Sequence, residues 1–376
     1  MQKKLIALAI AGLSSTAFAQ TNVTIQGLFD TGYQSFKQEA GAVTTKTNRV
    51  GSLSNSATTN LTFVVNEDLG GGMKAGLWLE TDPAAGTNQA AFGGTSMWNS
   101  QNYLFVSGNF GKVSLGFMNN FALTSALTSQ PFGIGMGGGY SREFGRLNGV
   151  GVIGAPAVIA GGQIAAAAAN GFTASSGGRD IRANNSLRYD TPTWNGFSAG
   201  LVYRSSNSGA NNAADADGQT QIGLNYNNGP LNVSYTNSNI MSNVNGIGAM
   251  NTTHNLLGAN YTFGTFTLMG GWTSSKNNVS PARTVDARSW NVAMKWQATP
   301  TLAVMGNILK VDDKIAATAV TGDQDRDLNA LGLDYAMSKR TTAYARWENG
   351  DNDKQSTTGN GTGKFTRYAF GLRHSF

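Results

Sequence analysis

The chain has 376 residues, of which 40% are hydrophobic and only 13% are charged, with 49 glycines, 7 prolines, no cysteine and a formal net charge of +6. The glycines follow no three-residue repeat and proline is scarce, which excludes collagen and proline-rich disorder, and the lack of cysteine excludes a disulfide framework. A soluble domain carries about 25% charged residues, so the low charge raises the question of what solvent covers this surface.

The N-terminal segment predicts a secretory signal peptide over residues 1–19. Lys3 and Lys4 precede an apolar stretch at 5–13 and the small-residue cleavage pattern at 17–19. Loss of this segment leaves a net charge of +4, which is too small to indicate a nucleic-acid partner. No later apolar run is long enough for a transmembrane helix, and residues 20–376 are expected to form a single domain.

The hydrophobic period of this domain is two, as in a β-strand with one apolar and one polar face. For example, Trp290, Val292 and Met294 alternate with Asn291 and Lys295. The pattern predicts an all-β chain of sixteen strands, at residues 23–36, 58–67, 73–80, 99–107, 112–118, 185–190, 197–204, 219–226, 231–238, 254–263, 265–274, 289–296, 301–311, 327–336, 340–348 and 367–376.

The connections between these strands alternate between short turns and long polar loops. Short turns lie at 68–72, 109–111, 227–230, 264, 299–300 and 338–339, and long loops at 37–57, 82–96, 205–218, 275–287, 312–326 and 349–363. This alternation is typical of a transmembrane antiparallel β-barrel with periplasmic turns and extracellular loops. A soluble β-helix or sandwich is the alternative, but it would turn its apolar face inward. Aromatic residues near strand ends on the apolar face favour the barrel: Tyr33, Trp272, Trp290, Trp296 and Tyr335.

The third loop, at about 119–183, contains no predicted strand. It includes an apolar glycine-rich run at 131–139 and an alanine-rich run at 164–170, so we expect it to fold into the lumen and narrow the channel; an extracellular cap is the alternative. Its charged cluster is Arg142, Glu143 and Arg146. The alternation along the predicted strands places five basic side chains on the inner face, where they could face this cluster: Arg188, Arg204, Lys295, Arg367 and Arg373. Such opposed rows of charge favour anions when the positive side dominates.

Short segments spread over the chain carry a family resemblance. They are the segments at 23–27, 67–75 (EDLGGGMKA), 108–116 (GNFGKVSLG), 182–192, 333–341 and 371–376 (GLRHSF). Together they resemble the general porins of Neisseria and the Burkholderiales. The resemblance implies a homotrimer of 16-stranded barrels in the bacterial outer membrane, in contact with its lipid and lipopolysaccharide. It also implies that Phe376 is the signal read by the barrel assembly machinery.

The same resemblance implies passive, often anion-preferring diffusion of small hydrophilic solutes and ions past an inward-folded third loop. Three departures concern the charge of the constriction. Asn60 stands where relatives have the arginine of Ser-Arg-Leu-Gly, Phe117 replaces the arginine of Leu-Gly-Arg, and 99–101 lacks the usual basic residues. We therefore do not expect strong anion selectivity.

Catalysis is not expected. His254 and His374 are the two histidines, and neither accompanies a nucleophile motif or a metal-binding cluster. The acidic run at 323–327 lacks the glycine and distal glutamate of a calcium loop, so no cofactor or metal is predicted.

The sequence predicts an outer-membrane diffusion porin. Two other functions stay open: a substrate-specific channel, and a surface adhesin or receptor with incidental conductance.

Overall fold

A computed structural model describes residues 22–40, 43–53, 55–83, 98–138, 182–205, 218–244, 248–278, 286–313, 325–351 and 363–376. These residues form one antiparallel sheet and one short helix, α2 (Phe121–Thr128). The strands are β1 (Asn22–Ala40), β2 (Val43–Gly51), β3 (Asn60–Gly70), β4 (Met73–Thr81), β5 (Asn102–Gly108), β6 (Gly111–Asn119), β7 (Arg182–Asp190), β8 (Phe197–Arg204), β9 (Gly218–Asn228), β10 (Leu231–Val244), β11 (Gly248–Phe263), β12 (Phe266–Asn278), β13 (Asp286–Gln297), β14 (Leu302–Asp313), β15 (Arg326–Ala336), β16 (Thr341–Gly350) and β17 (Gly363–Ser375).

The sheet closes on itself as a barrel. From β3 onward each strand pairs with the next, and β17 returns to pair with β1 from Leu28 opposite Ser375 to Ala40 opposite Gly363. β2 and β3 both pair with β1, β2 along residues 32–40 and β3 along residues 22–28, so the two strands share one position in the wall. The barrel therefore has 16 positions, which confirms the predicted fold.

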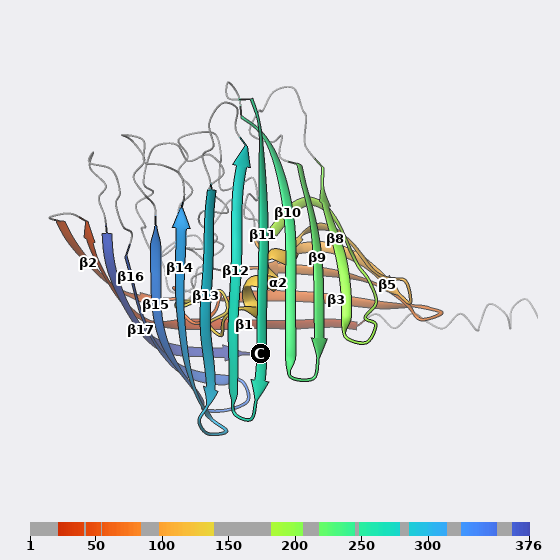
Figure 1. Ribbon diagram of the computed structural model, residues 1–376. Coiled ribbons are helices and arrows are strands. Elements are labelled where there is room, and N and C mark those ends of the chain that lie inside the picture. Colours follow the sequence, from red (N-terminus) through yellow and green to blue (C-terminus); the bar gives the residue numbers. More distant parts are fainter. Residues whose placement is uncertain are drawn as a thin grey trace, which may run out of the picture.

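Short turns connect the strands at one end of the barrel, which we call the turn end; Figure 1 shows those after β9 and β11 at the bottom. Glycines allow the tightest of them, as at Gly229, whose φ of 56° is a left-handed conformation. The opposite, loop end holds one departure from the sequence prediction. Residues 37–57 were expected to be a loop, yet β1 continues to Ala40 and β2 follows at once. The outer part of this hairpin is polar on both faces, so it carries no hydrophobic period.

The two faces of the wall differ as the alternation predicts. In β13, Trp290, Val292 and Met294 are 46%, 59% and 40% exposed on the outer face, whereas Ser289 and Asn291 are buried on the inner face. Exposed large apolar side chains recur on the outer face of most strands, where lipid takes the place of water. Among the described residues, no helix is both long and apolar enough to cross a bilayer.

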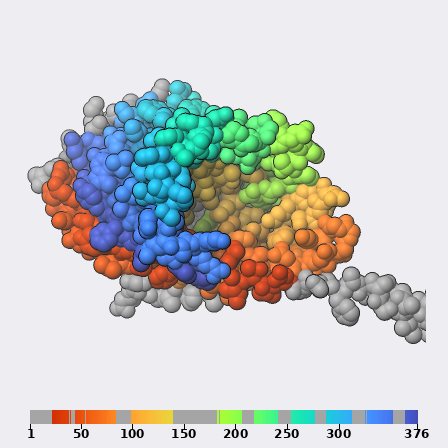
Figure 2. Space-filling view, turned by 90° about the horizontal axis from the view of Figure 1, so that it is seen from below, coloured from red at the N-terminus to blue at the C-terminus, as the bar shows by residue number. Residues whose placement is uncertain are grey.

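Helix α2 lies inside the barrel, against the inner faces of β9 to β12 (Figures 1 and 2). Phe121 and Ala122 are buried, and Ala122, Leu123 and Ala126 pack on Leu256 of β11. Glycines in the wall make room for the helix, since a Cβ at Gly258 would come within 2.0 Å of the Ser125 carbonyl oxygen. The described part of the third loop thus folds into the lumen, as predicted. The helix itself was not predicted.

Candidate pore constriction

The beginning of the third loop is hydrogen-bonded along the inner wall. We call residues 119–138 the third-loop segment. At α2, the Ala122 amide donates to Oε1 of Gln221 at 3.2 Å, and the Ser125 hydroxyl lies 3.0 Å from that of Ser234 and 2.8 Å from that of Thr236. Wall amides continue the contacts beyond α2: Nδ2 of Asn260 donates to the Thr128 carbonyl at 3.0 Å, and Nδ2 of Asn291 to the Ser129 carbonyl at 2.8 Å.

The glycine-rich part of the segment crosses to the next strands of the wall. Gly137 has φ of 95°, a conformation that favours glycine, and both of its backbone polar groups are bonded to wall side chains. Its amide donates to Oε2 of Glu348 at 2.7 Å, and its carbonyl accepts from Nδ2 of Asn307 at 2.9 Å. Glu348 is buried and forms an ion pair with Arg367. The segment is therefore fixed to the wall from β9 to β16.

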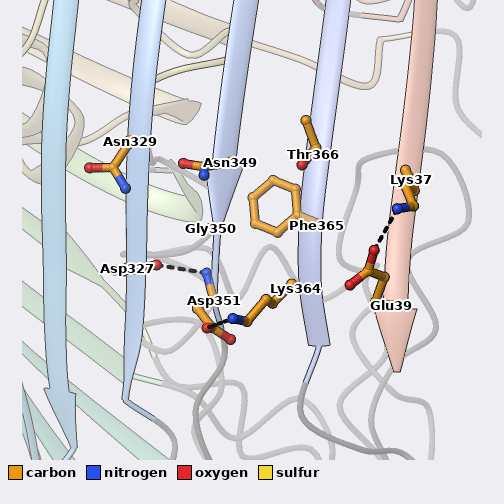
Figure 3. Close-up of a pocket in the computed structure, with 10 residues that line it drawn as sticks. All are labelled: Lys37, Glu39, Asp327, Asn329, Asn349, Gly350, Asp351, Lys364, Phe365 and Thr366. Carbon is orange, nitrogen blue, oxygen red and sulfur yellow. Dashed lines mark hydrogen bonds and ion pairs between the residues drawn. The ribbon is translucent and has the colours of Figure 1, made fainter. Parts of the chain in front are cut away.

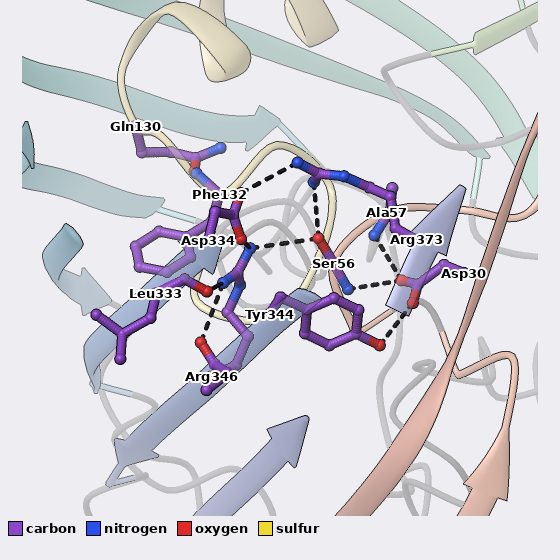
Figure 4. Close-up of polar contacts among 11 residues, drawn as sticks. Asp30, Ser56, Ala57, Gln130, Phe132, Leu333, Asp334, Tyr344, Arg346 and Arg373 are labelled. Carbon is purple, nitrogen blue, oxygen red and sulfur yellow. Dashed lines mark hydrogen bonds and ion pairs between the residues drawn. The ribbon is translucent and has the colours of Figure 1, made fainter. Parts of the chain in front are cut away.

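A second inward feature interrupts the wall between β2 and β3. We call residues 55–59 the inner turn. The amides of Ser56 and Ala57 both donate to Oδ2 of Asp30 at 2.8 Å, and the Tyr344 hydroxyl donates to Oδ1 of Asp30 at 2.5 Å (Figure 4). The inner turn in turn contacts the third-loop segment, because the Met136 amide donates to the Asn55 carbonyl at 3.0 Å. Asp30 is completely buried and anchors this arrangement.

Two arginines of the last strands complete the network in Figure 4. Nη2 of Arg346 lies 2.6 Å from Oδ1 of Asp334, and Nη2 of Arg373 lies 3.1 Å from Oδ2 of the same carboxylate. Both arginines also donate to the Ser56 hydroxyl, at 3.3 and 2.8 Å. The Arg346 guanidinium lies 5.7 Å from the centre of the Phe132 ring in the third-loop segment. The two guanidinium groups share the Asp334 carboxylate, and together with Asp30 the network holds two positive and two negative formal charges.

Arg188 holds the start of the third-loop segment on the other side. Its guanidinium pairs with Asp190 at 2.6 Å, donates to the Asn119 carbonyl at 2.7 Å and lies 4.1 Å from the centre of the Phe121 ring. Such a cation over an aromatic face is attractive. The positive charge of Arg188 is therefore largely balanced by Asp190 and by contacts within the protein.

The basic residues predicted to face the lumen have different environments in the structure. Arg188, Arg367 and Arg373 contact the third-loop segment or its anchors, whereas Arg204 is buried on β8 and Lys295 is exposed on the inner face near the turn end. The predicted loop cluster of Arg142, Glu143 and Arg146 lies outside the described residues, so its position opposite these cations stays a prediction. Arg346 and Asp334 were missed, although Arg346 has the same inward phase as Tyr344 and Glu348 in the strand pattern.

A cavity of about 250 Å³ opens at the loop end, between β1 and β15 to β17 (Figure 3). Its charges are nearly balanced, since Lys37 pairs with Glu39 at 2.5 Å and Lys364 with Asp351 at 3.6 Å. In the part of the chain that the structure describes, no group of three or more metal-ligating side chains is present.

Comparison with known proteins identifies the family. The model of the family described as Gram-negative porin matches residues 5–355. The chain belongs to the Gram-negative porin family. The porin is 30% identical over 367 residues to outer membrane porin protein 32 of Delftia acidovorans, covering 96% of this chain and 92% of the relative. It is 27% identical over 403 residues to the major outer membrane protein P.IB of Neisseria lactamica, covering 100% of both chains.

A solved structure supports the same fold. The anion-selective porin from Comamonas acidovorans aligns with a TM-score of 0.72 and 24% identity, over 95% of this chain and 100% of that one. The family resemblance predicted from the sequence is confirmed, as are the barrel and the outer-membrane location. The porin is an outer-membrane channel for passive diffusion. The turn end is then periplasmic and the loop end extracellular.

Proposed function

We propose that the third-loop segment and the inner turn form the waist of this channel, and that the waist passes small hydrophilic solutes and ions with a weak preference for anions. The observation that supports it most is the chain of hydrogen bonds from Gln221 of β9 to Glu348 of β16, which fixes the segment inside the lumen. Figure 2, seen from below, shows this gold segment within the hollow of the barrel.

The weak preference follows from how the inward charges are paired. Asp190, Asp334 and Glu348 neutralise most of the arginine charge near the waist. The uncharged Gln101, where relatives carry a cation, donates to the carboxylate of Glu80 at 3.1 Å. Three inward lysines near the turn end form no ion pair with a described carboxylate: Lys74, Lys112 and Lys295. Two inward carboxylates, Asp30 and Glu80, also form no ion pair in the described residues, but they are buried and hydrogen-bonded to neutral donors. The three lysines outnumber them, so a modest positive potential remains.

We further propose that the porin acts as a homotrimer in outer-membrane lipid and lipopolysaccharide, and that Phe376 carries the signal for the assembly machinery. In support, Phe376 follows β17 where the last strand meets β1, and its backbone exchanges hydrogen bonds of 3.1 and 3.2 Å with Gly27. Its side chain is 49% exposed at the surface of the closed barrel. The proposed role is that of a channel without catalytic activity.

Recording from planar bilayers under a KCl gradient tests the proposed ion preference and the proposed trimer. We expect conductance in steps that close in groups of three, with a small reversal potential of the sign for anions. Replacing Lys74, Lys112 and Lys295 together by glutamine should move the reversal potential toward cations, because the unpaired positive charge is lost. The control is Lys310→Gln, at an exposed position on the outer face of β14. A cation-selective wild type, or no shift in the triple variant, would contradict the proposed origin of selectivity.

A further inference from the structure

The inner face of β4 and β5 carries aromatic side chains. Leu104 and Val106 of β5 are 61% and 41% exposed on the lipid side, so the alternation turns Tyr103 and Phe105 into the lumen. Trp78 of β4 is paired with Tyr103 in the register and faces inward with it. The corresponding positions of β9 and β10 hold small or polar residues. We call Trp78, Tyr103 and Phe105 the aromatic shelf.

The rings of the shelf are neighbours along the wall. The rings of Trp78 and Tyr103 are nearly parallel, with an interplanar angle of 8° and centres 6.2 Å apart, and the Phe105 ring lies 6.3 Å from that of Tyr103 and is tilted by 50° to it. The Phe105 ring reaches over Gly76, where a Cβ would lie 2.3 Å from its Cζ atom. The shelf therefore lies along the wall, and all three side chains are partly exposed.

One cation accompanies the shelf. Nζ of Lys112 lies 4.4 Å from the centre of the Phe105 ring and 5.2 Å from that of Tyr103, and it forms no ion pair with a described carboxylate. The neighbouring carboxylate of Glu80 is buried, and it accepts hydrogen bonds from Trp78 at 3.0 Å, from Ser100 and from Gln101. Asp190 lies opposite Lys112 in the register, but its carboxylate is paired with Arg188 at 2.6 Å, so the Lys112 ammonium is left to interact with a solute at the shelf.

The shelf lies beside the waist. Phe105 pairs with Ser114, and Ser114 pairs with Arg188, so Phe105 and Arg188 face the lumen from strands separated only by β6. Arg188 in turn lies over Phe121 at the start of the third-loop segment. A solute that passes the waist therefore passes the aromatic shelf.

We propose that the aromatic shelf is a binding site for planar aromatic carboxylates on their way through the pore. The ring of such a solute stacks on Trp78 and Tyr103, and its carboxylate pairs with Lys112. Aromatic pairs gain attraction beyond that of the buried area, and the ammonium selects an anionic over a cationic ring. The site rests on the proposed function as an open channel and narrows its preferred solutes to a chemical class.

The experiment is a titration of single-trimer KCl conductance with sodium benzoate and with sodium cyclohexanecarboxylate. The two acids carry the same charge and similar bulk, but only benzoate has an aromatic face. We expect benzoate to reduce the current saturably, with a half-saturating concentration roughly three- to tenfold lower than that of cyclohexanecarboxylate. Equal values for the two acids would overturn the proposal. Loss of KCl conductance itself would instead refute the proposed function.

Two variants assign the effect to the shelf. Trp78→Leu should remove the difference between the acids, whereas the matched control Trp290→Leu, on the lipid side, should retain it. Lys112→Gln should weaken block by both acids equally, because it removes the shared charge interaction. If Trp78→Leu does not assemble, the Lys112→Gln titration and the comparison of the two acids in the wild type test the proposed site. A benzoate preference that persists in Trp78→Leu would contradict the assigned position.

Discussion

Replacement of Asp30 by alanine is expected to release the inner turn. The Asp30 carboxylate accepts the Ser56 and Ala57 amides at 2.8 Å each and the Tyr344 hydroxyl at 2.5 Å, and it is completely buried. A hydrogen bond to a charged group contributes about 1.5–3 kcal/mol, and bonds within one network do not add fully. The variant should therefore destabilise the closed inner turn by about 3–5 kcal/mol, because the Ser56 and Ala57 amides are left without this acceptor.

The released turn should loosen the waist. The Asn55 carbonyl accepts the Met136 amide at 3.0 Å, and Gly135 packs against the Ser56 backbone, so the third-loop segment loses a support. We expect excess low-frequency noise in the open-channel current of Asp30→Ala in planar bilayers. Asp30→Asn, which retains the shape and one acceptor, should give an intermediate level. The β-ladder is unchanged, so the variant should still migrate as a folded protein before heating in a detergent gel.

The control for this prediction is Asp312→Ala, because Asp312 is exposed at the loop end of β14. It removes the same chemical group without touching the waist. If Asp30→Ala and Asp312→Ala give the same current noise, the inner turn does not support the third-loop segment and the reasoning is refuted. Noise in both variants above wild type would point to a general effect of lost acidic charge.

Two further variants test the packing of the wall. Gly258→Ala places a Cβ about 2.0 Å from the Ser125 carbonyl oxygen, so α2 must move into the lumen and unitary conductance should fall. Gly306→Ala, whose Cβ has no neighbour nearer than 3.7 Å, should leave conductance unchanged, and an equal fall in both would contradict the close packing of α2. Val292→Lys places a charge in the lipid and should lower the free energy of unfolding in vesicles by about 2–4 kcal/mol, measured by urea titration. A loss as large for Ser198→Lys, on the lumen side, would show that lipid exposure is not the cause.

The barrel was predictable from the sequence because its wall has lipid on one face and water on the other, and this produces a regular alternation of apolar and polar residues. Along β13, lipid selects Trp290, Val292 and Met294 and the lumen selects the residues between them, so the strands and their phase can be read directly. The outer half of the first hairpin was not predictable, because residues beyond the membrane need no apolar face. Helix α2 escaped prediction because it has eight residues, no side-chain cap and no acidic residue in its first turn.

The polar waist was predictable only in part. In the structure Arg188, Arg367 and Arg373 form ion pairs on the inner face, and strand phase alone did not reveal that carboxylates neutralise most of their charge. Which inward side chains meet depends on the register and on the third loop, and neither can be read from one strand. The aromatic shelf was missed as well, because the aromatic residues singled out in the sequence were those near strand ends on the apolar face, and Trp78, Tyr103 and Phe105 lie on the other face.

The network around Asp30 also crosses the seam where the ends of the barrel meet. Asp30 belongs to the first strand, Tyr344 to β16 and Arg373 to the last strand, and all of them converge on the inner turn. The bonds of Tyr344 to Asp30 and of Arg373 to Ser56 join the last strands to the first, so they form only when β1 and β17 are side by side. Closure of the cylinder therefore also completes the support of the inner turn. An intermediate with an open seam retains the bonds of Asp30 to Ser56 and Ala57 but lacks these two.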